Sequence, residues 1–251
     1  MLSQVVATGW RPRLTGVVHW WTCWSLQAVA TTVDGGDQLA SNLALLLLPL
    51  TLTDPRRWHW DDTGAAVVST GVGRRIVAAS GFLMCRIQVA GVYFHASTGK
   101  MAVGEWADGT ALYYWFTDPL FGGPGWMAGP MRWLLDSGPL LALATWSSML
   151  LELALFAALV MPRRARAVLL VAGIAFHAAI AAVHGLITFS LVMVAALILY
   201  LRPWDAPLDV VRRCASFVGD RAYVKPRHGP PEPDLAGGDV RRRAGDVPFG
   251  A

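Results

Sequence analysis

Six long apolar runs, separated by short polar breaks, constrain the fold of this chain more than any other feature. The runs cover residues 14–33, 39–53, 76–98, 139–161, 166–184 and 186–201. A helix needs about 20 residues to cross the hydrocarbon core of a bilayer, so the second and sixth runs are short for a full crossing. The breaks contain charged residues, glycine or proline, as at residues 34–37, 54–57 and 161–164. We therefore predict an all-α, multi-pass transmembrane helical bundle of about six spans over residues 1–203.

The composition supports a membrane protein and excludes several other classes. Hydrophobic residues make up 55% of the chain and charged residues 15%, whereas a soluble domain carries about a quarter charged residues. The net charge of +4 comes from short arginine clusters between apolar runs, so we expect no nucleic-acid partner. The three cysteines, Cys23, Cys85 and Cys214, lack metal-ligand spacing, and we expect no metal site. The Pro- and Gly-rich residues 204–251 predict a cytoplasmic tail, disordered from about residue 220.

The arginines predict the orientation of the bundle. Every second break is basic, and the residues concerned are Arg56, Arg57, Arg74, Arg75, Arg163, Arg164, Arg166, Arg202, Arg212 and Arg213. Because positively charged segments stay on the cytoplasmic side, both termini are predicted to be cytoplasmic in a protein of the plasma membrane. Residues 99–138 then form an outer loop rich in aromatic residues, with a short amphipathic stretch at 131–135. This loop is typical of an interfacial aromatic belt and is equally compatible with a lid over a site.

Three ionisable side chains fall deep inside apolar runs: Arg86, Glu152 and His177. Counted at 1.5 Å per residue from the cytoplasmic end of each run, all three lie roughly 14–16 Å deep, near the bilayer midplane. A lone charge at that depth costs several kcal/mol, so such groups should face the bundle interior and meet one another. We predict an Arg86–Glu152 ion pair with His177 nearby, and we interpret the pair as a polar clasp that fixes helix register.

A second polar group is expected at the outer end of the bundle. Its candidate catalytic residues are Lys100, His95 and His177, and its outer-face neighbours are His184, Glu105 and Trp106. Lys100 has two interpretations. It either anchors the helix end by reaching the headgroups, or it serves as a base whose amine is held in a partly dry cavity. From position alone the anchor is favoured.

Three motifs occur in order along the chain. Residues 34–38 read DGGDQ, residues 45–60 read LLLLPLTLTDPRRWHW, and residues 93–100 read YFHASTGK, followed by EWADGTALYYW from residue 105. With these motifs, residues 25–200 resemble the sporulation-delaying protein B (SdpB) family. That family belongs to the wider HTTM group of membrane proteins, which is distantly related to vitamin K-dependent gamma-glutamyl carboxylase. Members usually carry at least one further span on the amino-terminal side.

The carboxylase resemblance falls on individual residues. Its catalytic lysine precedes an acidic residue–Trp pair and corresponds to Lys100 ahead of Glu105-Trp106, and its later Phe-His motif corresponds to Phe176-His177. The carboxylase pattern has two adjacent lysines where this chain has Gly99-Lys100, and its spacing to the tryptophan is about one residue shorter. Its large lumenal domain has no counterpart here. We therefore do not transfer glutamate carboxylation to this chain.

The resemblance implies a role in maturing a secreted bacterial peptide toxin. In that role the protein would work with an SdpA-like partner to convert an SdpC-like toxin precursor into active peptide. Two other classes stay open: a non-catalytic scaffold or transport-like membrane protein, and a carboxylase-like, quinone-linked membrane enzyme. The Lys100 group favours an enzyme, whereas the lack of an intact known catalytic set favours a scaffold. The residues indicate no particular cofactor.

Overall fold

The computed structural model describes residues 6–59 and 71–203, and every regular element in these two ranges is a helix. The all-α prediction is therefore confirmed for the described part of the chain. The predicted tail at residues 204–251, Cys214 within it, and Arg212 and Arg213 lie outside the described residues.

Each apolar run forms helix, and the second run forms two. The elements are α2 (Pro12–Val29), α3 (Gly35–Leu46), α4 (Leu48–Thr53), α6 (Val72–Met101), α10 (Gly138–Ala157), α11 (Arg163–His184) and α12 (Ile187–Leu201). The division between α3 and α4 falls just before Pro49, which has no N–H to donate to the preceding turn. Helix α3 begins at a sequence-encoded cap, because the Asp34 carboxylate accepts a hydrogen bond from the Asp37 N–H at 2.8 Å.

By length and composition, α6, α10 and α11 are long and apolar enough to cross a membrane, and α12 is a shorter apolar helix. These are the described helices that meet that criterion, so the count of six spans and the cytoplasmic placement of both termini stay predictions. Apolar side chains cover much of the outside of these helices; Val168 and Val171 on α11, for example, are each 69% exposed. Such a surface is expected where lipid rather than water surrounds a helix.

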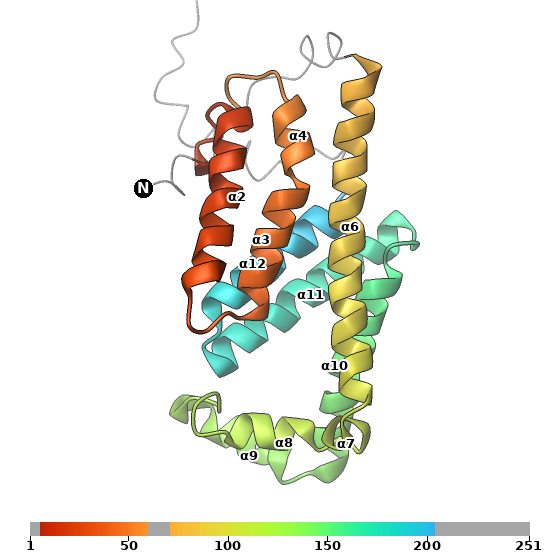
Figure 1. The fold of residues 1–251 in the computed structure, drawn as a ribbon. Helices are drawn as coiled ribbons and strands as arrows, with labels where there is room; N and C mark the ends of the chain where they lie inside the picture. The colour runs from red at the N-terminus through yellow and green to blue at the C-terminus, as the bar shows by residue number, and fades with distance from the viewer. Residues whose placement is uncertain (1–5, 60–70, 204–251) are drawn as a thin grey trace, which may run out of the picture. The chain divides into compact units, whose positions relative to one another are not determined.

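The core lies between α3, α6, α10 and α12. Helix α10 packs along α6, α12 packs against α11, α3 and α6, and α2 packs against α3 and α4 (Figure 1). The side chains that form the core include Leu39, Val89, Tyr93, Leu155, Met193, Leu197 and Tyr200. Small residues allow the close approaches: a Cβ added at Gly173 of α11 would meet the Leu197 Cδ1 of α12 at 2.7 Å.

The segment between α6 and α10, residues 102–137, is called the outer segment after its predicted location. It contains more regular structure than the loop predicted there. It contains the short helices α7 (Gly104–Ala107), α8 (Ala111–Thr117), η1 (Gly125–Met127) and α9 (Ala128–Leu135). Helices α8 and α9 run across the bundle near the carboxyl end of α6 (Figure 1). The predicted amphipathic stretch lies within α9, where Met131 is buried and Trp133 is 69% exposed.

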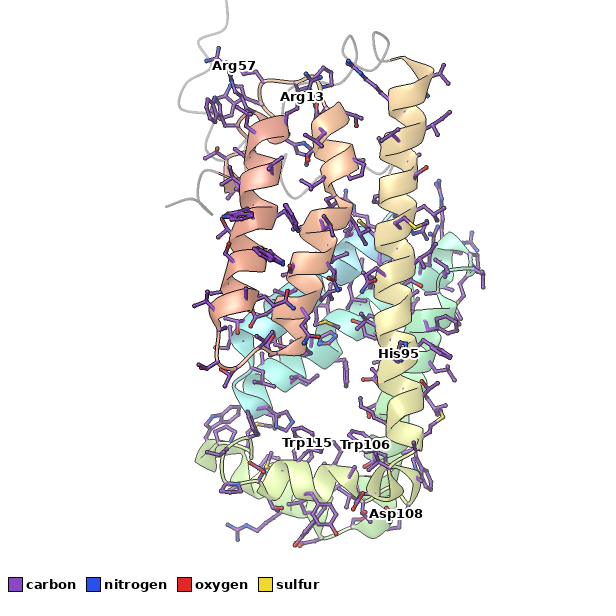
Figure 2. The ribbon with its side chains drawn as sticks, viewed as in Figure 1. Arg13, Arg57, His95, Trp106, Asp108 and Trp115 are labelled. Atoms are coloured by element: carbon purple, nitrogen blue, oxygen red, sulfur yellow. The ribbon has the colours of Figure 1, made fainter. Side chains whose placement is uncertain are left out.

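The basic segment and the aromatic outer segment lie at opposite ends of the described helices. Arg13 and Arg57 lie at one end, and Trp106, Asp108 and Trp115 lie at the other (Figure 2). Helix α6 runs from one end to the other, because its 30 residues extend about 45 Å. Which of these two ends faces the cytoplasm stays a prediction of the arginine pattern.

Candidate functional site

An ion pair between Lys100 and Glu152 joins α6 to α10 near the outer segment. The Lys100 Nζ lies 2.5 Å from the Glu152 Oε1, and the side chains are 25% and 6% exposed. Lys100 is in the last turn of α6, where a cation also interacts favourably with the carbonyl end of the helix dipole. Glu152 is on the buried face of α10, together with Met149 and Leu155.

The register of the two helices explains why these side chains meet. Helices α6 and α10 are antiparallel neighbours, and the Ser97 hydroxyl donates a hydrogen bond to the Met149 carbonyl at 3.1 Å. Side chains on a helix lean toward its amino end, so Lys100 leans back toward the level of Ser97. Glu152 leans back toward Met149 on the opposing helix for the same reason. The two charged groups therefore converge at the level of the Ser97–Met149 contact.

Trp106 covers the Lys100 ammonium from the outer side. The Lys100 Nζ lies 4.7 Å from the centroid of the Trp106 ring, within the range of a cation–π interaction. The turn after α7 holds the tryptophan in place by packing on α10. Gly109 has φ +86°, and a Cβ there would meet the Ala142 Cβ at 2.7 Å, while the Trp146 indole N–H donates to the Ala107 carbonyl at 3.3 Å.

A second buried hydrogen bond lies beside the ion pair. The Tyr93 hydroxyl and the His177 Nε2 are 2.9 Å apart and join α6 to α11, and both side chains are almost fully buried. The His177 ring lies among aromatic rings, with centroids 5.2 Å from Phe176 and 5.8 Å from Phe189. Lys100 interacts electrostatically with His177, and Glu152 does so with Tyr93. The two pairs therefore form one polar group, the Lys100–His177 cluster: Lys100, Glu152, Tyr93 and His177.

Several buried polar atoms in and near this cluster have no hydrogen-bond partner. They are the Glu152 Oε2, the His177 Nδ1, the Thr145 Oγ1 and the Ser190 Oγ, and each belongs to a residue that is at most 5% exposed. Buried polar groups in proteins are nearly always hydrogen-bonded, so these atoms favour a polar group or water between the helices. Within residues 6–59 and 71–203, no three His, Cys, Asp or Glu side chains gather in a way that could hold a metal ion.

The arrangement suits proton transfer. A lysine in hydrogen-bond contact with a buried carboxylate forms a pair across which a proton can pass. The unpartnered Oε2 of Glu152 provides a second acceptor position on the same carboxylate.

Comparison with known proteins decides the family. The HTTM domain matches residues 45–204. The chain belongs to the HTTM domain family. It is 40% identical over 205 residues to the uncharacterized protein YitO of Bacillus subtilis and 39% identical over 215 residues to the sporulation-delaying protein SdpB of the same organism. Each match covers 82% of this chain, and they cover 65% and 66% of the relatives, so the chain spans somewhat less than two thirds of their length. No solved structure matches.

The resemblance to the sporulation-delaying protein B family is thereby confirmed, and the HTTM match includes the whole Lys100–His177 cluster. The structure also brings together the two segments that the carboxylase resemblance singles out. Lys100 contacts Trp106 of the acidic residue–Trp pair, and it interacts electrostatically with His177 of the Phe-His motif.

The predicted Arg86–Glu152 ion pair is wrong for this HTTM protein, since Glu152 pairs with Lys100. With Ser97 opposite Met149, Glu152 lies level with Phe94, and Arg86 is eight residues farther along α6, about 12 Å away. Arg86 instead lies beside Tyr200, with its Cζ 5.9 Å from that ring centroid. The depth prediction assumed that all helices begin at one level, whereas α6 extends well beyond the start of α11.

The other predicted outer residues are separated from Lys100. His95 is exposed and contacts Phe94, because it lies on the side of α6 opposite Tyr93 and Ser97. His184 stacks on Phe116 at 5.7 Å and its Nδ1 contacts the Phe121 carbonyl at 2.6 Å, so it joins the end of α11 to the outer segment. Glu105 is exposed. Of the predicted outer-face neighbours, only Trp106 is brought to Lys100 in the described residues.

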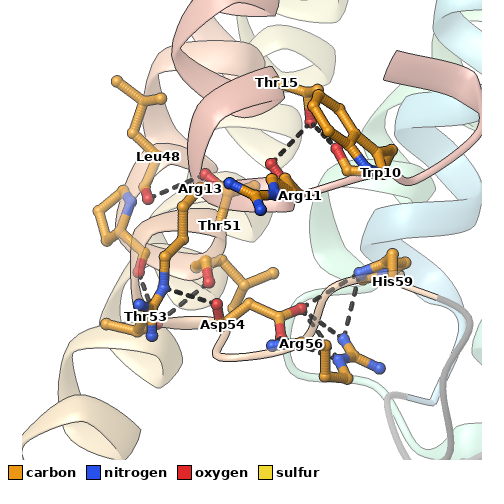
Figure 3. Close-up of polar contacts among 12 residues, drawn as sticks. Trp10, Arg11, Arg13, Thr15, Leu48, Thr51, Thr53, Asp54, Arg56 and His59 are labelled. Atoms are coloured by element: carbon orange, nitrogen blue, oxygen red, sulfur yellow. Dashed lines mark hydrogen bonds and ion pairs between the residues drawn. The ribbon is translucent and has the colours of Figure 1, made fainter. Parts of the chain in front are cut away.

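A polar contact at the basic end was not anticipated from the sequence. Asp54, just after α4, accepts hydrogen bonds from the Arg56 Nε at 2.8 Å and Nη2 at 2.6 Å, and its carbonyl accepts one from the Arg13 Nε at 2.8 Å (Figure 3). Burial alone would raise the pKa of Asp54, but the hydrogen bonds and charge of Arg56 outweigh it and hold the pKa below its usual range. The sequence Asp54-Pro55-Arg56 could have predicted the Asp54–Arg56 contact, because a turn at the proline brings the two charged side chains together.

Proposed function

We propose that this HTTM protein acts on an exported peptide at the outer end of its bundle, as a maturation or processing factor for a secreted peptide toxin. The proposal places it as a multi-pass protein of the plasma membrane, with the Lys100–Glu152 pair as the reactive group. One observation carries it: a lysine in hydrogen-bond contact with a buried carboxylate, beneath Trp106, in a family that includes sporulation-delaying protein SdpB.

The proposed chemistry is acid–base catalysis by a shared proton. When the proton moves from the Lys100 Nζ to the Glu152 Oε1, an ion pair becomes a neutral amine and a neutral acid, and no lone charge is left buried. The neutral amine can then take a proton from one atom of the substrate, and Glu152 can give its proton to another atom of the substrate, which restores the ion pair. As the partners in this role we propose an SdpA-like protein and an SdpC-like toxin precursor, which the family resemblance implies.

A second candidate function is a non-catalytic scaffold that docks a partner on the outer segment. The observation that favours it is the aromatic surface of α8, η1 and α9, where Tyr114 is 58% exposed, Trp126 74% and Trp133 69%. Such a surface suits either the bilayer interface or a protein partner.

Substituting arginine for lysine separates these functions. Lys100→Arg keeps a positive charge beside Glu152 but cannot release a proton near neutral pH. The protein would be co-expressed with an SdpA-like protein and an SdpC-like precursor, and the mature peptide quantified by mass spectrometry. We expect active peptide to fall at least about 100-fold while the protein still accumulates in the membrane.

The matched control is Glu105→Gln, which changes an exposed acidic residue on neighbouring α7. Full activity of Lys100→Arg would reject the catalytic role. Loss of activity in Trp126→Ala and Trp133→Ala, with Lys100→Arg active, would instead support the scaffold. Added mass on glutamates of the peptide would point to the carboxylase-like, quinone-linked alternative.

A further inference from the structure

Two arginines on different helices lie close together at the level of the α10–α11 turn, farther from the outer segment than the Lys100–His177 cluster. Arg86 is near the middle of α6, and Arg166 is in the basic first turn of α11, just after the α10–α11 turn. Their charges interact with each other, and both interact with Tyr200 of α12. The register of α6 against α10 places Arg86 level with residue 160, at that same turn.

Neither guanidinium has an anionic partner within residues 6–59 and 71–203. The Nε atoms of Arg86 and Arg166 are both buried and both lack a hydrogen-bond acceptor. The carboxylates that form ion pairs in this part of the chain, Asp54 and Glu152, are engaged with Arg56, His59 and Lys100. The Tyr200 hydroxyl donates to the carbonyls of Leu155 and Phe156. Because each arginine is only partly exposed, water screens their repulsion incompletely, and a group that supplies negative charge would stabilise the arrangement.

We propose that Arg86 and Arg166 together bind a phosphate group, and that this phosphate belongs to the headgroup of an anionic phospholipid. A guanidinium presents planar, forked donors that match phosphate oxygens, and two forks from two helices can hold one phosphate from two sides. This site is distinct from the Lys100–His177 cluster, because Arg86 is about 12 Å from the level of Glu152 along α6.

The surroundings of the two arginines favour a lipid over a free anion. Exposed apolar side chains lie near the two arginines: Ile87, next to Arg86 on α6, is 44% exposed, and Val160 at the α10–α11 turn, level with Arg86, is 88% exposed. These side chains provide a surface for acyl chains next to the place where the headgroup would bind. Basic pockets between membrane helices commonly bind such headgroups.

Lipid titration of the purified full-length protein tests this site. Delipidated protein in neutral detergent would receive phosphatidylglycerol, phosphatidylcholine or inorganic phosphate, and both the unfolding midpoint and the retained lipid would be measured, the latter by native mass spectrometry. We expect phosphatidylglycerol alone to raise the midpoint and to be retained. Arg86→Gln and Arg166→Gln should each weaken phosphatidylglycerol binding at least about tenfold, as expected for loss of a charge-assisted hydrogen bond.

Arg164→Gln is the matched control, because it removes one positive charge from the same helical turn at an exposed position. It should retain the binding of the unchanged protein. Arg86→Lys, which keeps the charge and loses the fork, should bind with intermediate affinity, and it replaces Arg86→Gln if that variant does not fold.

Three outcomes would overturn the proposal. Equal binding of phosphatidylcholine and phosphatidylglycerol, or equal loss in Arg164→Gln, would show that the two arginines form no specific site. Equal stabilisation by inorganic phosphate would assign the site to a free anion rather than to a lipid.

Discussion

The Lys100 ammonium and the Glu152 carboxylate meet at 2.5 Å although 52 positions separate them in the sequence. The two side chains differ in their access to solvent, at 25% and 6% exposed, and Lys100 is also covered by the Trp106 ring. Loss of Lys100 and loss of Glu152 should therefore reduce the stability of the protein by different amounts.

Removal of Lys100 should destabilise the protein more than removal of the Glu152 charge. Lys100→Met leaves a carboxylate buried without its cation, at a cost of about 3 kcal/mol, whereas Glu152→Gln leaves a partly exposed ammonium that can turn toward the outer segment. The double variant should recover much of the loss. Unfolding midpoints in detergent measure the effect, and additive losses in the double variant would contradict the pairing.

Gly109→Ala should disturb the turn that places Trp106. The residue has φ +86°, and its new Cβ would meet Ala142 at 2.7 Å, so we expect a loss of about 1–3 kcal/mol. Gly104→Ala is the control, because a Cβ there has open space around it. Thermal unfolding compares the two, and equal midpoints would show that the turn tolerates a side chain.

Asp54 should contribute stability that is lost in acid. Its pKa is lowered in the folded protein, so its contribution is fully present above the unfolded value of about 4 and falls as the pH drops through the lower folded value. The midpoint difference between the unchanged protein and Asp54→Asn should therefore be largest near neutral pH and should shrink below about pH 4. Asp136→Asn, which removes an exposed carboxylate, is the control. A constant difference across the titration would contradict the assignment.

Thiol labelling tests the predicted orientation. Single cysteines at Val72 and Leu120, which are 72% and 86% exposed at opposite ends of the described helices, would be introduced after replacing the three native cysteines. The positive-inside rule predicts that an impermeant reagent added to intact cells labels position 120 and spares position 72 until the cells are lysed. Labelling of 72 alone would reverse the orientation.

The sequence predicts the helices well, because long apolar runs leave few alternatives to helix in this chain. It predicts the contacts between helices less well, as Glu152 illustrates. Counting from the end of each run places Glu152 level with Arg86. The Ser97–Met149 contact fixes a different register of α6 against α10, in which Lys100 is the partner of Glu152. The separation of His95 from Lys100 could be predicted from helical geometry alone. The two residues are five positions apart, so their side chains point about 140° apart around the helix.

The family motifs were informative where residue depth was not. They singled out Lys100, Trp106 and His177, which the fold brings into contact or electrostatic range of one another. Tyr93 begins the YFHASTGK motif but had no assigned role, because a tyrosine in an apolar run is usually a packing residue. Its hydrogen bond to His177 depends on the position of α11, which no local pattern encodes.

The length of α6 joins the two ends of the protein mechanically. In its first half the helix packs on α4, where a Cβ at Gly81 would lie 3.2 Å from the Pro49 Cβ, and in its last turn it carries Lys100. No loop lies between these points to absorb movement. A displacement of α4 that does not bend this continuous 30-residue helix would shift Lys100 against Glu152, so we expect the ion pair to respond to events at the far end of α6.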